Sequence, residues 1–266
     1  MRLTSKNYYG NKANTEYLSV SQYKDFYGTL AYRGCEACAF EKLNGRYEQK
    51  PNTAMLIGGY VDSYVEGTLD EFKGKNPEIF NSRTGELKAD FKLADRIIER
   101  IERDVKFMQY LSGEKQKIMT GELFGAMWKI KIDSYIKNKA IVDLKVVKNI
   151  YDSVYVKDLG RLNFIQAGGY DFQLAVYQKI AAANTGKLLP CYIAAVDKTE
   201  PFNLELIQIT QNELDGALIG VPYGVERIKR IKSGEVEPER CGRCDYCKET
   251  KVITRPITMA ELGVGG

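Results

Sequence analysis

The sequence predicts a single α/β domain in which helices and strands pack in layers. Two adjacent strand-like runs lie at 126–136 and 140–147, a long amphipathic helix precedes them, and a helix with two more strands follows. The order of helices, three strands, helix, two strands and helix is typical of a layered α/β architecture. A chain of 266 residues can bury most of its apolar surface in one domain, and no repeat or low-complexity linker divides it.

Three helices are expected before the strands. The sequence Ser-Val-Ser-Gln is a capping box that opens a helix over about 19–27. A second helix is expected over 53–69, with a glycine pair at 58–59 that another element must approach closely. A third is expected over 88–111, because apolar residues recur there at helical spacing.

Strands and helices alternate through the rest of the chain. Alternating apolar residues predict strands, and 3.6-residue periodicity predicts helices. The expected elements are strands at 117–123, 189–196 and 202–209, and helices at 164–183 and 211–234, the last interrupted at Pro222. From Glu235 onward the tail is polar and rich in cysteine.

The two central strands carry acidic residues on one face. If residues 137–139 form the loop between them, Asp133 lies directly opposite Asp143, and Lys145 shares that face. Opposed side chains have Cβ atoms about 4.5–5.5 Å apart, so two carboxylates there are destabilising unless a cation bridges them. A register one residue different would instead place the two aspartates on opposite faces.

This constellation predicts metal-assisted hydrolysis, because two carboxylates and a lysine can surround a hard divalent ion. The chain has no histidine. Ser-His-Asp and Cys-His systems, His-ligated zinc hydrolases and nucleases with a histidine base are therefore excluded.

Charge and hydropathy bear on partners and compartment. The net charge of +4 gives slight support to a polyanion partner, and lysines crowd around the acidic hairpin, where phosphates need neutralising. The basic run at 227–232 is more typical of a solvated face. No apolar run approaches the ~20 residues of a membrane span, and the start lacks a signal-peptide stretch, so we expect a cytoplasmic protein without a membrane partner.

Together, these elements resemble the PD-(D/E)xK nuclease superfamily, above all its phage-type, RecE-like and RecB-like exonuclease branch. Asp133 matches the first acidic residue, and Asp143-Leu144-Lys145 matches the (D/E)-x-K element. Gln173 and Tyr177 match a Gln-x-x-x-Tyr element on the following helix, although a half-buried pair that satisfies backbone groups would look the same. The likeness runs from about residue 18 to residue 248.

Three more acidic residues fit the resemblance. Asp62 and Glu66 fall in the helix that carries an acid or histidine near the metal in such nucleases, although their spacing of four also suits a solvated face. Glu122 lies where these nucleases often have a glutamate ahead of the core strands. RecB-type members often have histidine at the position of Asp62, so this chain would have a more acidic metal shell.

The resemblance implies a restriction-endonuclease-like core, with a central mixed sheet flanked by helices. It implies that Asp133, Asp143 and the Leu144 carbonyl hold Mg²⁺ or Mn²⁺ and that Lys145 acts on the water or the phosphate. The implied function is a DNA exonuclease that acts on linear ends, 5′→3′, in phage or prophage recombination with a single-strand annealing protein. Ring-forming relatives make a homo-oligomer conceivable. A CRISPR-adaptation-type nuclease that trims single strands, or a catalytically silent DNA-binding module, would be the alternatives.

The chain has six cysteines, and five of them fall in two clusters. Cys191 lies in an apolar strand and is expected in the core. Cys241, Cys244 and Cys247 are too closely spaced for disulfides, and such spacing predicts a metal site. A Cys₄ zinc site would combine the pair at 35 and 38 with one pair from the tail.

A 4Fe–4S cluster would instead use the three tail cysteines and one remote cysteine. Relatives with such a cluster join the two ends of the domain in this way, and the resemblance implies Cys35 as the remote ligand. Under either assignment the metal would join the segments at about 18–45 and 235–250 and would take no part in the chemistry.

Overall fold

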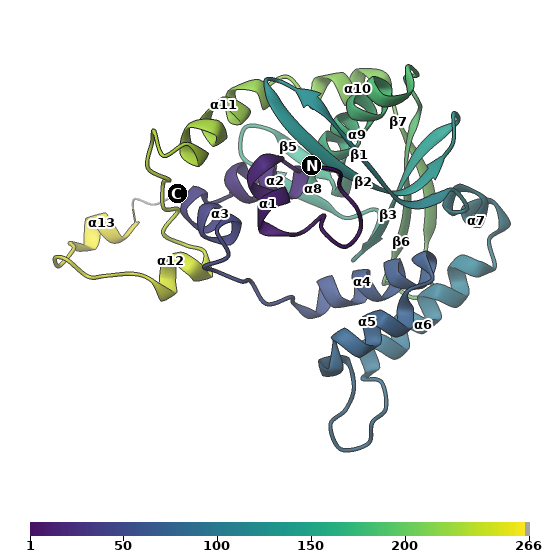
Figure 1. Cartoon of the computed structure of the whole chain (residues 1–266). Helices are drawn as coiled ribbons and strands as arrows, with labels where there is room; N and C mark the ends of the chain where they lie inside the picture. Colours follow the sequence, from purple (N-terminus) through teal and green to yellow (C-terminus); the bar gives the residue numbers. More distant parts are fainter. Residues whose placement is uncertain (264–266) are drawn as a thin grey trace.

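Five strands form one mixed sheet in the computed structural model, which describes residues 1–263 (Figure 1). Their spatial order is β1-β2-β3-β6-β7. Only β3 and β6 run parallel, and the connection between them passes through the helices that follow β3. The strands are β1 (Glu114–Leu123), β2 (Ala126–Ile136), β3 (Ala140–Val147), β6 (Cys191–Asp197) and β7 (Leu204–Ile209). This confirms the predicted α/β domain with a central mixed sheet.

Helices cover both faces of the sheet, each over its own apolar cluster. One cluster packs the sheet against helices α2 (Val20–Tyr27), α9 (Tyr170–Thr185), α10 (Gln211–Gly216) and α11 (Val221–Lys232). The other packs it against α4 (Thr53–Glu66), α6 (Ala89–Glu102) and α7 (Val105–Leu111), with α5 (Leu69–Lys75) beside them. Among residues 1–263, no helix has the length and apolar character that crossing a membrane requires.

Two of the predicted helices are each divided in the structure. The helix expected over 88–111 divides into α6 and α7, because Asp104 caps a new helix by accepting a 2.9 Å hydrogen bond from the Phe107 N–H. The helix expected over 164–183 divides into α8 (Phe164–Gly168) and α9 at Gly169, whose φ of 61° ends the first helix. A polar cap and a left-handed glycine outweighed the apolar periodicity.

Other boundaries differ by a few residues. Helix α2 has the predicted capping box, whereas α4 ends at Glu66 because Gly67 adopts a φ of 78°. Within α4, a Cβ at Gly59 would lie 2.8 Å from the Phe72 ring, which confirms close approach there but not at Gly58. The short elements that were not predicted are α1 (Asn11–Glu16), α3 (Glu36–Leu43), α5, η1 (Pro77–Ile79), β4 (Ser153–Val156), β5 (Gly160–Asn163), α12 (Asp245–Glu249) and α13 (Met259–Gly263).

Strands β2 and β3 have the predicted register but separate early. Ile136 pairs with Ala140 across a loop at 137–139, in which Asn138 has a φ of 60°. The pairing ends at Ser134 and Val142, one pair before the two aspartates. From there β2 pairs only with β1 and, at its other edge, with Leu18, whose N–H donates to Met127 O at 2.8 Å.

Strand β2 also changes face where it leaves β3. Trp128, Ile130 and Ile132 are buried in the cluster under α9, and so is Tyr135, although strict alternation would put it on the opposite face. The reversal therefore falls between Ile132 and Tyr135, at the position of Asp133. Backbone pairing between β2 and β3 is therefore absent beside this residue within the described residues.

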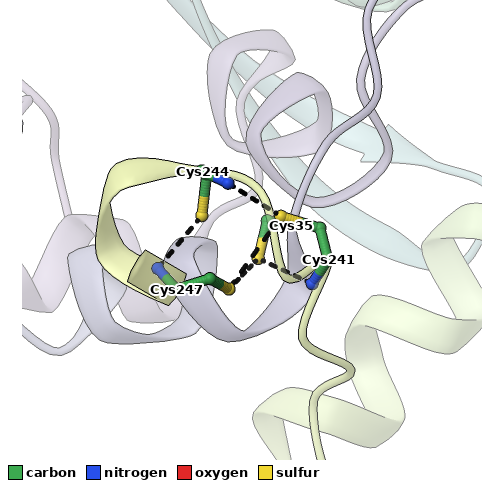
Figure 2. Close-up of side chains that lie close together, drawn as sticks. All are labelled: Cys35, Cys241, Cys244 and Cys247. Atoms are coloured by element: carbon green, nitrogen blue, oxygen red, sulfur yellow. Dashed lines mark hydrogen bonds between the residues drawn. The ribbon is translucent and has the colours of Figure 1, made fainter. Parts of the chain in front are cut away.

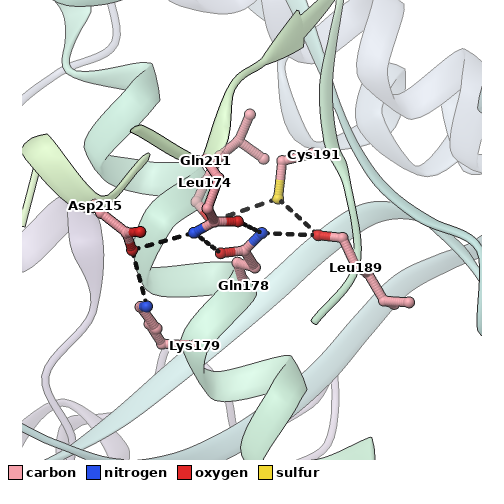
Figure 3. A network of polar contacts seen from close by, with 7 residues as sticks. All are labelled: Leu174, Gln178, Lys179, Leu189, Cys191, Gln211 and Asp215. Carbon is pink, nitrogen blue, oxygen red and sulfur yellow. Dashed lines mark hydrogen bonds and ion pairs between the residues drawn. The ribbon is translucent and has the colours of Figure 1, made fainter. Parts of the chain in front are cut away.

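Cys191 is fully buried at the start of β6, as predicted. Its surroundings fix the position of α9 against the sheet (Figure 3). Gln178 on α9 donates 2.9 Å to the Leu189 carbonyl and exchanges hydrogen bonds with Gln211 on α10. The helix that carries Gln173 and Tyr177 is thus held by both the chain entering β6 and α10.

Candidate active site and cysteine site

The acidic pair and the lysine of the (D/E)-x-K element meet at the point where β2 leaves β3. Asp143 is 1 % exposed at the side chain, and its Oδ2 lies 2.6 Å from Lys145 Nζ. Asp133 Oδ2 accepts a 3.0 Å hydrogen bond from the Leu144 backbone N–H. The Leu144 N–H thus bonds to the Asp133 side chain instead of to a backbone carbonyl of β2. This contact holds Asp133 beside the Asp143-Leu144-Lys145 segment.

Helix α9 supplies the next contact. Gln173 Nε2 donates 2.6 Å to Asp143 Oδ1 and lies 3.4 Å from the Tyr177 hydroxyl. Both side chains point from one helix face toward β3, as the spacing of four predicts. Gln173 holds the Asp143 carboxylate directly, so it orders the strand of the site rather than satisfying a backbone group.

Helix α4 and strand β1 close the other side. Gln116 on β1 donates a hydrogen bond to Glu66 Oε1 and a longer one, 3.5 Å, to Asp133 Oδ1. Asp62, one turn before Glu66, lines the same cavity as Asp133. The structure thus brings Asp62 and Glu66 to the acidic cluster.

Burial and mutual repulsion disfavour the ionised form of the carboxyl groups in this cluster. Burial raises the pKa of Asp62 to about 7, helped by the charges of Asp143 and Glu66 and opposed by Lys145. Burial also raises the pKa of Asp133 well above its ordinary value, and the charge of Asp143 adds to this. Burial acts to lower the pKa of Lys145, but the charges of Asp143 and Asp133 outweigh it and raise that pKa.

A divalent cation fits this donor set. Within the described residues, the side-chain oxygen Gln116 Oε1 is buried without a hydrogen-bond donor, and the buried Asp143 Oδ2 has Lys145 Nζ as its close partner; both oxygens lie at the acidic cluster. Hard cations such as Mg²⁺ prefer carboxylate and carbonyl oxygens and keep several waters. A cation here would offset the like-charge repulsion that raises the carboxyl pKa values.

A cavity of about 590 Å³ opens from the cluster to solvent. Asp62, Glu66 and Asp133 line its acidic part. The remaining lining includes Tyr9 and Lys131, neither of which the sequence singled out as a site residue. The sequence could have indicated Lys131, because strand alternation places it on the same face as Asp133, two residues away. Gln116 and Tyr9 reach the cluster only through the tertiary fold.

The structure does not bring Glu122 to the site. Glu122 is exposed and pairs with Met127 near the β1–β2 turn. From Met127 to Asp133, β2 extends about 20 Å at ~3.4 Å per residue. Glu122 is therefore removed from the expected metal ligands, because β1 reaches the cluster with Gln116 instead.

Behind the cluster, two lysines flank one aromatic ring. Lys145 Nζ lies 4.9 Å and Lys24 Nζ 5.1 Å from the centroid of the Tyr170 ring. Lys24 Nζ also donates 2.9 Å to the Gly168 carbonyl. Burial lowers the pKa of Lys24 to about 8, with a further contribution from the charge of Lys145. The Tyr170 ring thus makes cation–π contacts with the ammonium groups of both lysines.

A second cluster contains four cysteines from both ends of the domain (Figure 2). The Sγ atoms of Cys35, Cys241, Cys244 and Cys247 all lie within 4.8 Å of one another. Cys35 Sγ accepts backbone N–H groups at 3.5 Å from Cys38 and Cys241. This set can bind a metal ion, and it contains Cys35 with all three tail cysteines, whereas Cys38 lies outside it.

Two of the six sulfur–sulfur separations in this set are known individually, and all six are within 4.8 Å. Cys35 and Cys247 sulfurs are 3.6 Å apart, and those of Cys241 and Cys247 are 3.9 Å apart. Thiolates bound to one Zn²⁺ at ~2.3 Å have sulfurs ~3.8 Å apart at the tetrahedral edges. A 4Fe–4S cluster binds each thiolate at a different iron and requires wider spacing.

Polar contacts also join the tail to α3. Glu36 accepts two hydrogen bonds from Arg227, at 3.0 and 2.9 Å, and one of 2.8 Å from the Glu239 N–H. The Ala37 N–H donates 3.0 Å to Glu239 O. Arg227 therefore has a structural partner, which accounts for part of the basic run at 227–232.

A crystal structure at 2.19 Å from Eubacterium rectale, described as a "Putative exonuclease", matches with a TM-score of 0.97 and 55% sequence identity, covering 100% of this chain and 99% of that chain. The structure of SSO0001 matches with a TM-score of only 0.30 at 12% identity, over 82% of this chain and 93% of that chain, and supports no conclusion. No curated protein matches the chain.

The family comparison matches residues 19–250, nearly the same span as the resemblance identified from the sequence. The matching profile is described as a PDDEXK-like domain of unknown function, DUF3799. The chain therefore belongs to the DUF3799 family of PDDEXK-like domains, within the PD-(D/E)xK superfamily.

Proposed function

We propose that this protein is a metal-dependent exonuclease that hydrolyses phosphodiester bonds at the ends of linear DNA. The observation that carries the proposal is the convergence of Asp133, Asp143 and Lys145 beside an open cavity, with the buried Asp143 carboxylate held between Lys145 and Gln173. The similarity over the full chain to the Eubacterium rectale protein supports the exonuclease assignment by its description.

Asp133 and Asp143, with the Leu144 carbonyl, would hold Mg²⁺ or Mn²⁺, and Asp62 and Glu66, which line the same cavity as Asp133, would supply further carboxylate oxygens. Bound there, the ion activates water and offsets the charge that develops on the phosphate. Gln173 fixes the orientation of the Asp143 carboxylate. These residues position their oxygens before substrate arrives, which is how a preorganised site lowers a barrier.

Lys145 acts as a cation rather than a base. In the metal-free protein, the neighbouring carboxylates raise the pKa of Lys145, so the side chain is protonated at neutral pH before metal binds. A protonated Lys145 next to the cluster can stabilise the negative charge of the phosphorane as it forms. Of the roles open to the lysine, stabilisation of the phosphate is therefore the one that its surroundings favour.

Polarity and biological setting are proposed from the resemblance. We propose 5′→3′ digestion in phage or prophage recombination, in a homo-oligomer and together with a single-strand annealing protein. A DNA-binding module without activity would not need the Asp133, Asp143 and Lys145 cluster to be intact. A nuclease that trims single-stranded ends is the alternative, and it would degrade single-stranded but not duplex linear DNA.

The test is degradation of end-labelled linear and covalently closed circular DNA with and without Mg²⁺. Linear DNA should be degraded only with the metal, and Asp143→Asn and Lys145→Ala should each abolish the reaction. Glu122→Gln is a matched control, because this acid lies on the same sheet and away from the cluster. Robust cleavage in EDTA would refute metal dependence, and cutting of closed circles would indicate an endonuclease.

The cysteine site is proposed as a structural metal site that joins the chain ends. The 4Fe–4S cluster implied by the resemblance and a zinc ion both fit the ligand types, and the 3.6 and 3.9 Å sulfur separations favour zinc. Metal binding there would contribute to the folding free energy, because the thiolates come from segments at opposite ends of the sequence.

A further inference from the structure

The first residues of the chain, 1–17, form an arm that lies over β2 (Figure 1). Lys129 on β2 is 1 % exposed, and its Nζ donates 2.6 Å to both Tyr8 O and Asn14 Oδ1. Lys232 on α11 donates 3.1 Å to Asn14 O. A buried ammonium group must keep its hydrogen bonds, so these contacts fix the arm to the sheet.

The fixed arm carries two neighbouring tyrosines in opposite environments. Tyr8 is 6 % exposed, and Tyr9 is 67 % exposed. Their rings meet edge to face, with centroids 5.0 Å apart. Tyr8 therefore anchors the arm and supports Tyr9, whose ring remains open to solvent in a defined position.

Tyr9 is also part of the cavity that contains the acidic cluster. It lines that cavity together with Asp62 and Asp133. Lys131 Nζ lies 4.9 Å from the centroid of the Tyr9 ring, and this lysine projects from β2 two residues before Asp133. An aromatic ring and a cation thus stand together at the edge of the proposed catalytic centre.

This pairing is the recognition chemistry of single-stranded nucleic acid, where bases stack on aromatic rings and cations follow the phosphates. A base inside a duplex offers no free face to such a ring, whereas an unpaired base does. On the basis of the proposed nuclease function, we propose that Tyr9 stacks on an unpaired base close to the scissile phosphate. The strand entering the cavity is then single-stranded where it passes the arm.

The test uses the full-length protein and single-stranded oligonucleotides with 2-aminopurine at successive positions from the end, in Ca²⁺. The wild type and Tyr9→Phe should quench the fluorescence at one or two adjacent positions, and Tyr9→Ala should not. Tyr9→Ala should also weaken binding at least about fivefold. Tyr223→Ala is the control, because this α11 tyrosine is 83 % exposed and lies outside the cavity lining.

Three outcomes would overturn the inference. The first is that Tyr9→Ala quenches the fluorescence as much as the wild type does. The second is that Tyr9→Ala and Tyr223→Ala lose the same affinity for the single strand. The third is that Tyr9→Ala weakens binding to blunt duplex and to single strand equally. Each can occur while the wild type still degrades linear DNA, so the proposed function would survive. Conversely, quenching without degradation of any DNA would refute the proposed function and leave the stacking contact in place.

Discussion

Gln173 and Asp143 are joined by a 2.6 Å hydrogen bond from the amide Nε2 to Oδ1, although they lie on different elements, α9 and β3. The opposite oxygen of the same carboxylate lies 2.6 Å from Lys145 Nζ. Asp143 is thus held from both sides, and the position of its buried side chain depends on both contacts. This relationship makes Gln173 a positioning residue of the proposed site.

We therefore predict that Gln173→Ala lowers the turnover of linear DNA by ~10–100-fold, the usual effect of losing a group that orients a metal ligand. Tyr177→Phe should have a much smaller effect, because the hydroxyl is 3.4 Å from Gln173 Nε2 and does not reach Asp143. Initial rates at saturating DNA and Mg²⁺ measure both variants. Near-normal turnover of Gln173→Ala would show that Lys145 alone orients the carboxylate.

The two catalytic aspartates should differ in their effect on stability. Asp133→Asn should stabilise the metal-free protein by ~1 kcal/mol, because it removes a charge that burial and Asp143 disfavour and keeps an acceptor for the Leu144 N–H. Asp143→Asn should destabilise it, because Lys145 loses its buried partner. Denaturant unfolding in EDTA tests the contrast. Equal shifts of the same sign for both variants would contradict it.

Stability without metal should also depend on pH through Asp62. Its pKa rises from 3.8 in the unfolded chain to about 7 in the folded one, so between these values the folded state binds more protons. Stability from this group is therefore full below about pH 4 and declines as pH rises toward 7. Denaturant unfolding from pH 4.5 to 7 should show a smaller decline for Asp62→Asn than for the wild type. Identical slopes would mean that Asp62 titrates normally.

The cysteine site should respond differently to two neighbouring substitutions. Cys35→Ser should remove the metal and lower the thermal midpoint, whereas Cys38→Ser should retain both, because Cys38 lies outside the group of four sulfurs. Metal analysis of anaerobically prepared protein identifies the occupant. One zinc per chain and no colour would agree with the sulfur spacing, and brown protein with near-equal iron and sulfide would establish the cluster. Metal retention in Cys35→Ser would refute the ligand set.

Local signals in the sequence determined the strand pattern of the acidic hairpin and its register. Alternation and the turn at Asn138 were sufficient, because both depend on residues close together in the chain. The same locality explains the capping box at Ser19. The prediction of unbroken helices at Asp104 and Gly169 was wrong, because it followed a continuous apolar pattern. In the structure a single capping residue interrupts that pattern at each position.

Only the tertiary structure decided how the site is assembled. The early separation of β2 from β3 and the face reversal near Asp133 occur in the strand whose edge also pairs with Leu18, a contact between segments far apart in sequence. The arrival of Gln116 in place of Glu122, and of Tyr9 from the arm, follows from the same packing. Strand alternation constrains near neighbours, whereas these contacts depend on long-range packing that no local pattern encodes.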